Sequence, residues 1–345
     1  MGRNVTRRLR TLAWASLVAA AFAVWTPAQA DPFKLIVTET QTPLVPNSVS
    51  DLAIRLGYYK KAGVDVELVR VQQTPSAVAA LRAGEGDMAN ISIDTALQLV
   101  GRDQMKLRGV VSPDKALPFL IAAKKSIATP ADLDSKVFGV ARIGSVDYTL
   151  SRAALAKLGV PVDKLQYLSI GQPAVRAQSL LAGQIDATAV SIGVWTTLPD
   201  KSALSVLIDQ QNFYRLAPFV SKLNVVTEDV AKKKGKEITA VVRAIIMASR
   251  DFADNPKLWV DAMVEARPDV KREDLEALAE SYRKSWSVNG GLNLDDIKFT
   301  TDTEYASPDF QDVRRVEPRE WIDTSFVDAV LKELSTDRAF DAAGR

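Results

Sequence analysis

The sequence of 345 residues contains neither cysteine nor histidine. Without cysteine the chain has no disulfide, no thiolate nucleophile, no zinc–thiolate site and no cysteine to carry a lipid. Without histidine it has no Ser-His-Asp triad, no histidine general base and no imidazole ligand for a metal. Most hydrolase and metalloenzyme classes are therefore excluded, and we expect no catalytic residues, no metal and no cofactor. Enzymes that use only carboxylates or lysine stay open.

The chain also lacks a strong net charge. Its first thirty residues carry four arginines and no acid, which leaves 40 Lys and Arg against 42 Asp and Glu in the remainder. A net charge of about −2 gives no electrostatic basis for binding nucleic acid or an anionic membrane, so we expect neither partner. After residue 30 no segment is long and apolar enough to span a bilayer. The remaining length exceeds the usual size of a single core, so we expect two lobes.

The first thirty residues have the pattern of a secretory signal peptide. A basic start precedes an apolar run at Leu12–Trp25, and the small residues of Ala28–Ala30 form an A-x-A cleavage site. The apolar run is short and no stop-transfer pattern follows it, so we expect cleavage rather than a retained anchor. The signal predicts export, cleavage near Ala30 and a mature protein in the periplasm.

One segment of the chain occurs twice. "LRAGEGDMANIS" (81–92) aligns without a gap with "LLAGQIDATAVS" (180–191). The matches with structural meaning are Gly84 with Gly183, Asp87 with Asp186, and Ser92 with Ser191. In each copy the glycine ends a helical segment and the aspartate leads into an apolar strand. The repeat predicts two copies of one supersecondary unit.

Both copies extend toward the N-terminus in the order β-α-β-α-β. The first has strand Phe33–Thr38, helix Val49–Lys61, strand Val64–Val71, helix Pro75–Ala83 and strand Met88–Ile91. The second has strand Val137–Ala141, helix Val146–Leu158, strand Leu165–Ser169, helix Pro173–Ala182 and strand Ala187–Val190. Strands rich in Val, Ile and Leu, joined by crossover helices, predict parallel sheets covered on both faces. The fold class expected is α/β with two lobes.

Two extended apolar segments flank the second copy, Leu117–Lys124 before it and Ala217–Thr227 after it. We interpret them as the two passages of the chain between lobes. Lobe 2 is then an insertion at 117–220, and lobe 1 comprises 31–116 plus 221–345. After Thr227 the pattern is helical, with segments at Glu237–Pro256, Leu258–Glu265, Arg272–Trp286 and Phe326–Leu334. For the residues after Asp302, the sequence predicts no structure other than the helix at Phe326–Leu334.

Ligands of open parallel sheets bind beyond the carboxyl ends of the strands. In two facing lobes these ends border one cleft. Besides the loop Thr40–Ser50, the segments at these ends are Ser92–Thr95, Gly144–Tyr148, Gly171–Gln172 and Ser191–Trp195.

The turn at Gly144–Tyr148 has the strongest signal for binding. Gly144 permits a tight turn, Ser145 is a preferred helix N-cap, and the first amides of the following helix are free to bind an anion. The alternative is that Ser145 only caps its own helix. Asp147 opposes a plain anion site, because its carboxylate competes with an anionic ligand unless it faces away.

Asp94 presents a similar choice. It either caps a helix, which we favour, or accepts a hydrogen bond from an amine, amide or hydroxyl of a solute. Ser92 and Ser191 end equivalent strands and are candidates to contact a solute. The alternative is that either side chain only forms a hydrogen bond to the backbone of its own loop. Trp195 either stacks on a solute or packs between a loop and the sheet.

A family pattern covers most of the chain from Thr38 to Leu294. It is carried by the segments Gly57–Ser92, Ile127–Gly159, Leu180–Trp195, Ala240–Pro256 and Tyr282–Leu292. Together these resemble the sulfonate, nitrate and taurine type of ABC-transporter solute-binding proteins, a group that includes binders of thiamine pyrimidine precursors. The resemblance implies a type II periplasmic-binding-protein fold, with two lobes joined by two crossing segments, and closure around a small solute. We expect a monomer that delivers its solute to an inner-membrane ABC permease with its ATPase.

The resemblance also implies which residues line the cleft. They correspond here to Ser92, Asp94, Gly144, Ser145, Asp147, Gln172, Ser191 and Trp195, and we add their neighbours Thr95 and Tyr148. Many members carry a small or hydroxyl residue followed by proline where this chain has Asp94-Thr95. The departure favours a solute with at least one hydrogen-bond donor over a simple sulfonate or nitrate.

The function expected is therefore binding of a small polar organic solute, sulfonate-like or aminosulfonate-like, without catalysis. One alternative is a binder of an aromatic or pyrimidine-type precursor. Another is a sensor domain that presents its solute to a membrane receptor. An enzyme on the same fold is disfavoured by the missing histidine and by the export signal. The sequence identifies neither the solute nor the choice between transport and sensing.

Overall fold

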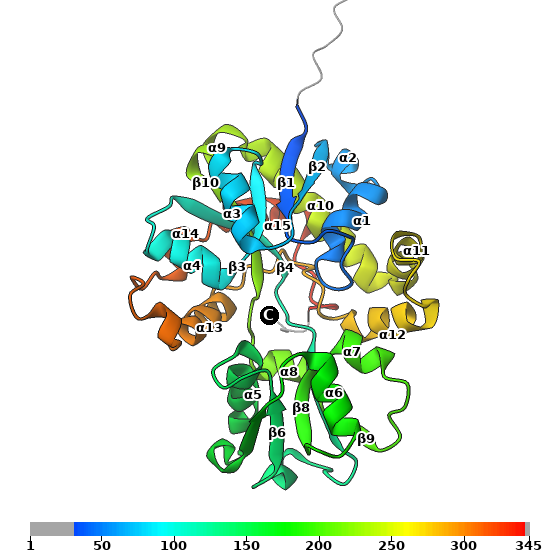
Figure 1. Cartoon of the computed structure of the whole chain (residues 1–345). Coiled ribbons are helices and arrows are strands. Elements are labelled where there is room, and N and C mark those ends of the chain that lie inside the picture. The colour runs from blue at the N-terminus through cyan, green and yellow to red at the C-terminus, as the bar shows by residue number, and fades with distance from the viewer. Residues whose placement is uncertain (1–30, 342–345) are drawn as a thin grey trace, which may run out of the picture. The chain divides into compact units, whose positions relative to one another are not determined.

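Two five-stranded sheets organise the part of the chain that the computed structural model describes, residues 31–341 (Figure 1). The predicted signal peptide lies outside the described residues. Sheet A has the order β2-β1-β3-β10-β4, with β1 Phe33–Val37, β2 Val66–Arg70, β3 Met88–Ser92, β4 Leu107–Asp114 and β10 Lys222–Thr227. Sheet B has the order β7-β6-β8-β5-β9, with β5 Phe119–Lys124, β6 Val137–Val140, β7 Gln166–Ser169, β8 Ala187–Ser191 and β9 Leu204–Ile208.

Both sheets are mixed, which corrects the expectation of wholly parallel sheets. β1 is parallel to β2 and β3, and β6 is parallel to β7 and β8, as the repeat predicts. By contrast, β10 runs antiparallel to β3 and β4, and β5 runs antiparallel to β8 and β9. β5 and β10 are the first strands that the chain forms after it passes from one sheet to the other. They do not follow a crossover helix on their own sheet, so the rule that keeps βαβ strands parallel does not apply to them.

The two passages between sheets are shorter than predicted. Most of each apolar segment assigned to a passage is a strand, because Phe119–Lys124 is β5 and Lys222–Thr227 is β10. Each is an inner strand of its sheet, between β8 and β9 or between β3 and β4, which explains its continuous apolar character. The chain passes between the sheets at 115–118 and at 217–221, which we call the first and second crossing segments.

The helix predicted at Val49–Lys61 is divided in two. Helix α1 covers Ser48–Arg55 and α2 covers Tyr58–Ala62. Between them Gly57 has a φ of 76°, in the left-handed region that ends an α-helix. The other helices of the repeat units are α3 Thr74–Ala83, α4 Ile93–Gly101, α5 Val146–Lys157, α6 Pro173–Leu181, α7 Ile192–Thr197 and α8 Gln210–Leu216.

A second group of helices follows β10. It comprises α9 Glu228–Lys233, α10 Gly235–Asp254, α11 Pro256–Ala266, α12 Arg272–Tyr282, α13 Leu294–Tyr305, α14 Pro318–Trp321 and α15 Ser325–Leu334. Short 3₁₀ turns lie at Pro130–Leu133, Val162–Lys164 and Pro308–Phe310. No helix within residues 31–341 is long and apolar enough to cross a membrane. The sequence pattern did not place α13 or α14.

Sheet A is covered on both faces. On one face, Ile238, Val242 and Ile245 of the long amphipathic helix α10 share a core cluster with Leu35 and Val111 of the sheet. On the other face, residues of α3, α4 and α13 pack on Ile36, Ile91 and Leu223. Fully burying one such side chain is worth about 1.5–3 kcal/mol, so α10 holds one face of sheet A in place.

The two aspartates of the sequence repeat, Asp87 and Asp186, make equivalent hydrogen bonds in the two sheets. Asp87 and Lys34 form a backbone pair, with the Lys34 carbonyl accepting from the Asp87 N–H at 2.8 Å and the Asp87 carboxylate accepting from the Lys34 N–H at 3.0 Å. Asp186 repeats both bonds with Val137, at 2.8 and 2.9 Å. A lysine pairs with each carboxylate, Lys234 at 2.7 Å and Lys124 at 2.8 Å. Each aspartate thus joins the first and third strands of its unit.

Candidate functional site

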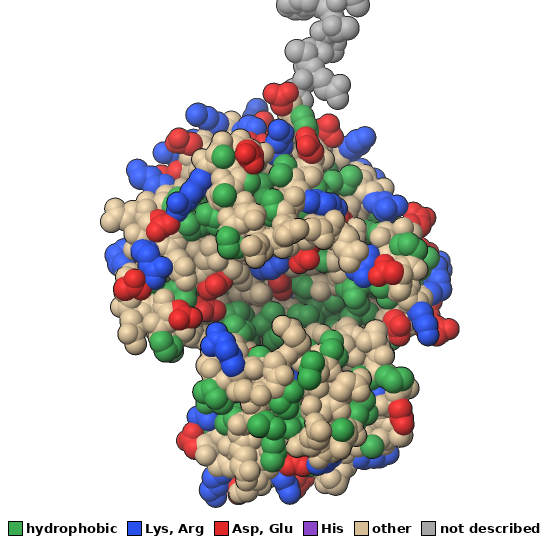
Figure 2. Space-filling model, in the orientation of Figure 1, with side chains coloured by type: hydrophobic (Ala, Val, Ile, Leu, Met, Phe, Trp, Pro, Cys, Tyr) green, Lys and Arg blue, Asp and Glu red, His purple; other side chains and the backbone are tan. Residues whose placement is uncertain are grey.

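A cavity of about 840 Å³ lies between the carboxyl-end edges of the two sheets. We call it the cleft; Figure 2 shows the recess between the two halves of the molecule. From the side of sheet A it is lined by Ser92, Asp94, Gln98, Ser221, Thr303, Glu304, Ser307 and Asp309. From the side of sheet B it is lined by Phe119, Arg142, Gly144, Ser145, Val146, Asp147, Tyr148 and Thr149. Six of the ten residues predicted from sequence therefore border one cavity.

The glycine–serine turn before α5 forms part of the lower wall. Gly144 has a φ of 82°, which a residue with a side chain rarely adopts. Ser145 occupies the N-cap position of α5 but makes no side-chain cap. Its hydroxyl lies 2.6 Å from the Arg142 carbonyl and 2.6 Å from a carboxylate oxygen of Asp147. The serine side chain therefore leaves the first-turn amides of α5 uncapped. This differs from the alternative in which Ser145 only caps its own helix.

Asp147 borders the cleft, but one of its two carboxylate oxygens is directed away from it. One carboxylate oxygen accepts from the Ala141 N–H at 2.9 Å and lies 3.4 Å from Nη2 of Arg176, and the residue is 6% exposed. Arg176 is itself buried and donates to Thr188 at 3.1 Å and to the Ala189 carbonyl at 2.9 Å. Burial lowers the pKa of Arg176, and the Asp147 carboxylate opposes that shift. One oxygen of Asp147 is thus paired in the interior beside sheet B, and the other lies at the Ser145 hydroxyl.

The opposite wall is acidic. Asp94 lies in the first turn of α4, where the N-cap position belongs to Ser92, so our interpretation of Asp94 as the cap was wrong. Glu304, near the end of α13, and Asp309 border the cleft beside it. Burial, followed by the charges of Asp94 and Asp309, raises the pKa of Glu304 to about 7. The carboxylates thus lie close enough to one another to interact.

Arg142 provides a positive charge on the facing wall. It is exposed, precedes the Gly144 turn and lines the cleft. Figure 2 shows acidic side chains on the upper rim of the recess and a basic side chain on the lower rim. The two walls therefore present opposite charge, which suits a solute that carries both an anionic and a donor group.

The sequence analysis missed Glu304 and Asp309 because α13 was not predicted. Its start does carry a recognisable signal. Asn293 is the N-cap, and its side-chain oxygen accepts from the Asp295 and Asp296 amides at 2.9 and 3.1 Å. An asparagine followed by two acids is a typical helix start.

A second group of polar residues lies at the same edge of sheet A. Asp114 ends β4, is 4% exposed, and receives a bond of 3.4 Å from the Asn47 amide. Burial raises the pKa of Asp114 to about 7, with Lys222 and Asn47 opposing and Glu39 adding to the shift. The Lys222 ammonium donates to Thr38 at 3.0 Å. Within the described residues, one oxygen each of Asp114 and Asn47 is buried without a hydrogen-bond donor.

The other four predicted residues do not line this cavity. The Thr95 hydroxyl lies 3.1 Å from that of Ser92. Ser191 caps α7, since its hydroxyl accepts from the Val194 amide at 3.3 Å. Trp195 is half-buried against the main core, with the Lys201 ammonium 6.0 Å from its ring. Gln172 is exposed at the start of α6. Their contact with a solute stays a prediction.

Tyr148 borders the cleft but also packs within its own half, with its ring 4.8 Å from that of Tyr167.

No group of three or more Asp, Glu, His or Cys within residues 31–341 is arranged to hold a metal ion. The lining thus offers hydroxyls, amides and charges of both signs, which bind a solute through hydrogen bonds and ion pairs.

Comparison with known proteins places this geometry in context. The family described as "NMT1/THI5 like" matches residues 51–258, whereas no curated protein matches the chain in sequence. The putative periplasmic sulfonate-binding protein SsuA from Methylobacillus flagellatus is 14% identical with a TM-score of 0.67, over 88% of this chain and 94% of its own. The aliphatic sulphonate-binding protein SsuA from Escherichia coli is 17% identical with a TM-score of 0.63, over 86% and 93%.

An enzyme shares the same architecture. The desulfurization enzyme DSZB is 12% identical with a TM-score of 0.57, over 88% of this chain and 99% of its own. At these identities the likeness establishes the fold alone. The predicted α/β fold of the type II periplasmic-binding-protein class, with two βαβ lobes and a cleft between them, is confirmed.

Proposed function

Because the chain belongs to the NMT1/THI5-like family, as the sequence resemblance predicted, we propose that it is the substrate-binding protein of an ABC importer. It captures a small polar organic solute in the cleft, closes by a hinge motion at the two crossing segments and delivers the solute to an inner-membrane permease with its ATPase. Lobe 1 comprises 31–116 plus 221–345, and lobe 2 comprises 117–220. The protein acts in the periplasm as a monomer after removal of its signal peptide.

The observation that carries this proposal is the pairing of opposite charges across one cavity. Asp94 and Glu304 face the cleft from one wall, and Arg142 with the uncapped start of α5 faces it from the other. An anionic group of the solute binds at the α5 amides and at Arg142. An amine or other donor of the solute binds the carboxylates of the opposite wall. An aminosulfonate-like solute meets both requirements.

Binding without turnover is the form of the proposal that the lining supports. The chain offers no histidine or cysteine, and the carboxylate of Asp147 is already bonded to Ala141 and paired with Arg176. Solute released from the protein by denaturation should therefore have the mass of the solute added. Recovery of a cleaved or desulfonated product would instead support an enzyme.

Thermal unfolding in the presence of candidate solutes tests the proposal. A panel of aminosulfonates, alkanesulfonates, carboxylates, pyrimidines and aromatic acids separates our preferred solute class from the alternatives. At one hundred times its dissociation constant, the true solute should add about 2.7 kcal/mol to the free energy of unfolding. If no member raises the melting temperature, and native mass spectrometry finds no co-purified small molecule, the transport proposal fails.

Calorimetry on variants then locates the site. Ser145→Ala and Asp94→Asn should both weaken binding of the solute that the panel identifies. Glu333→Gln, which removes one carboxylate from an exposed pair with Arg243, is the matched control, since neither residue lines the cleft. If both cleft variants bind as tightly as the parent, the solute does not sit where we place it.

A further inference from the structure

The end of the described chain is docked onto the protein rather than free. Helix α15 ends at Leu334, and Ser335, with a φ of 64°, turns the chain back. Arg250 donates to the Leu334 carbonyl at 3.1 Å and to the Ser335 carbonyl at 2.6 Å. Asn289 and Asp337 exchange two hydrogen bonds, at 2.7 and 2.9 Å. We call residues 335–341 the C-terminal strap.

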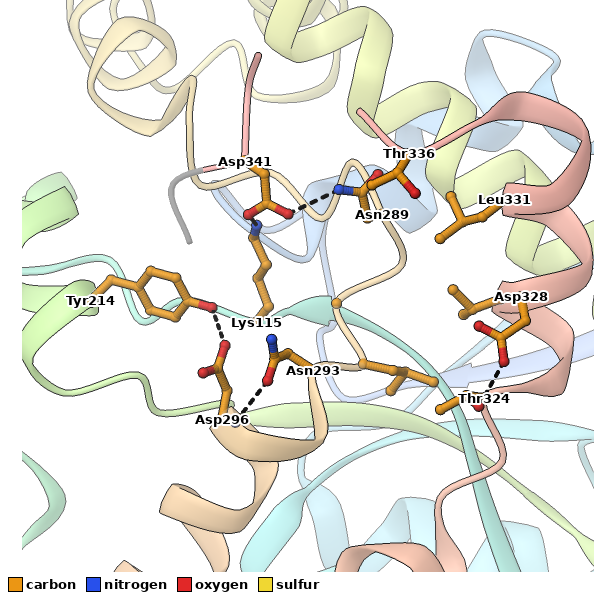
Figure 3. A pocket seen from close by; sticks show the side chains of 13 residues that line it. Lys115, Tyr214, Asn289, Asn293, Asp296, Thr324, Asp328, Leu331, Thr336 and Asp341 are labelled. Carbon is orange, nitrogen blue, oxygen red and sulfur yellow. Dashed lines mark hydrogen bonds and ion pairs between the residues drawn. The ribbon is translucent and has the colours of Figure 1, made fainter. Parts of the chain in front are cut away.

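The strap ends in a buried ion pair. One carboxylate oxygen of Asp341 lies 2.7 Å from the Lys115 ammonium, and the other accepts from the Asn289 amide at 2.9 Å (Figure 3). The two charged side chains are 6% and 11% exposed, for Lys115 and Asp341 respectively. Removing one partner of such a pair is strongly unfavourable, because the other charge stays buried and uncompensated. The ion pair therefore links the strap to Lys115.

Lys115 is the first residue of the first crossing segment, directly after β4. The same segment is bonded to both lobes, since Tyr282 donates to the Ala116 carbonyl at 3.1 Å and Gln210 of α8 donates to the Leu117 carbonyl at 3.5 Å. The Lys115 ammonium also lies 5.9 Å from the ring of Tyr214 on α8. The strap thus acts on the stretch of chain that joins the sheets.

A buried contact between the two halves adjoins the strap. The Tyr214 hydroxyl on α8 donates to Asp296 of α13 at 2.8 Å, and both residues line the small pocket of about 180 Å³ into which Lys115 and Asp341 extend (Figure 3). Ser285 donates to Gln210 at 2.7 Å in the same region. All these contacts exist in the arrangement in which the cleft is about 840 Å³ in volume.

We propose that the C-terminal strap is a clasp on the first crossing segment that stabilises the open arrangement of the lobes. This inference rests on the proposed hinge closure. A closing rotation must bend the crossing segment, and bending displaces Lys115 relative to Asp341 or to Tyr214. The ion pair therefore opposes closure, so that solute must supply the free energy to close the protein. Release of the strap shifts the population toward the closed state.

Interlobe distance in the solute-free protein tests the clasp directly. The chain has no cysteine, so Ala79→Cys on α3 and Gln178→Cys on α6, both exposed, place one spin label on each lobe without further changes. In this background Asp341→Asn should shift the distance distribution toward shorter values and raise the closed fraction about fivefold or more. Glu333→Gln, which breaks the exposed pair with Arg243 just before the strap begins at Ser335, should leave the distribution unchanged.

Two further variants protect the test against simple misfolding. A stop codon after Leu334 removes the whole strap, and Lys115→Gln with Asp341→Asn removes both charges, so that no buried charge is left unpaired. Both should shorten the distance as Asp341→Asn does. If every folded variant keeps the distance distribution of the parent, the strap is not a clasp.

The same labels separate this inference from the proposed function. If the solute shortens the distance in the parent but the strap variants do not change the solute-free distance, hinge closure stands and the clasp is wrong. If one fixed distance is found for all variants with and without solute, hinge closure fails, and the clasp fails with it.

Discussion

The carboxylate of Asp147 lies 3.4 Å from the guanidinium of Arg176, and both residues are buried beneath the start of α5. This relationship explains why an acid stands in the first turn of a helix that we propose to bind an anion. The negative charge is paired in the interior with Arg176, so it competes less with an anion at the helix N-terminus. It also holds the turn, since the same carboxylate accepts from the Ala141 amide before Gly144.

Asp147→Asn should lower the free energy of unfolding by about 3 kcal/mol, because Arg176 is then left buried without a counter-charge. Urea denaturation measures the change. Asp163→Asn breaks an exposed pair with Arg152 of the same helix and should lower it by less than about 1 kcal/mol. Equal losses in the two variants would show that the pair at Arg176 contributes no more than a surface pair.

The charges that face the cleft should determine affinity. Arg142→Gln should weaken binding of an aminosulfonate-like solute about tenfold, and Asp94→Asn should do the same, which corresponds to about 1.4 kcal/mol each. Calorimetry at fixed ionic strength measures both. Arg82→Gln, which breaks an exposed pair with Asp103 away from the cleft residues, is the control for loss of one surface charge. An effect of only one of the two variants would assign the solute a single charged group.

Stability should fall as the pH rises from about 4.5 to about 7, in part because of Glu304. Its pKa is raised to about 7 in the folded protein by burial and by Asp94 and Asp309, so the folded state holds a proton that the unfolded state has lost. The stabilisation by protonated Glu304 is fully present below pH 4.5, the ordinary pKa of its carboxyl. It is lost as the pH rises through about 7, the pKa of Glu304 in the folded protein. Glu304→Gln should remove this part of the slope in melting temperatures measured between pH 4 and 8.

Asp302 of the same helix gives the matched control. Burial acts to raise the pKa of Asp302, but the hydrogen bonds and charges of Lys298 and Arg315 outweigh burial. The pKa of Asp302 is therefore lowered. Asp302→Asn should therefore lower stability at neutral pH and have progressively less effect as the pH falls through the lowered pKa. If Glu304→Gln and Asp302→Asn change the pH profile in the same direction, the raised pKa of Glu304 is contradicted.

The repeated aspartates should have matching effects on the two lobes. Asp87→Asn and Asp186→Asn each remove a charge that accepts from a backbone amide and pairs with a lysine. We expect each to lower the free energy of unfolding by about 1–3 kcal/mol. Hydrogen exchange should show the loss of protection mainly in sheet A for the first variant and in sheet B for the second. Uniform loss across both sheets would mean that the lobes unfold as one unit.

The sequence was sufficient for the features that depend on local pattern. The two β-α-β-α-β units follow from apolar periodicity and from glycines that end helices, and the turn at Gly144 and Ser145 follows from the type of its residues. The antiparallel strands β5 and β10 were not predictable in this way, because strand direction is set by where the chain returns from the other sheet. The split between α1 and α2 depends on the backbone angle of one glycine, which periodicity does not reveal.

The acidic neighbours of Asp94 in the cleft wall, and the strap, were missed for a related reason. Asp94 and Glu304 are far apart in the chain, and only the path of α13 brings them together. Lys115 and Asp341 pair across most of the chain length, and neither belongs to a pattern that singles it out. The role of a charged residue whose partner is distant in the chain cannot be predicted from the residues next to it in sequence.

The neighbouring antiparallel strands β4 and β10 have a consequence for how lobe 2 is attached. Asp114 and Lys222, where the chain leaves and re-enters sheet A, are register partners across that pair. Topologically, everything between them is the connection of a β-hairpin, and a short turn can close such a hairpin. By strand order, the segment between Asp114 and Lys222 is therefore an insertion between two neighbouring strands of sheet A, and the two points where the chain leaves and re-enters that sheet lie side by side.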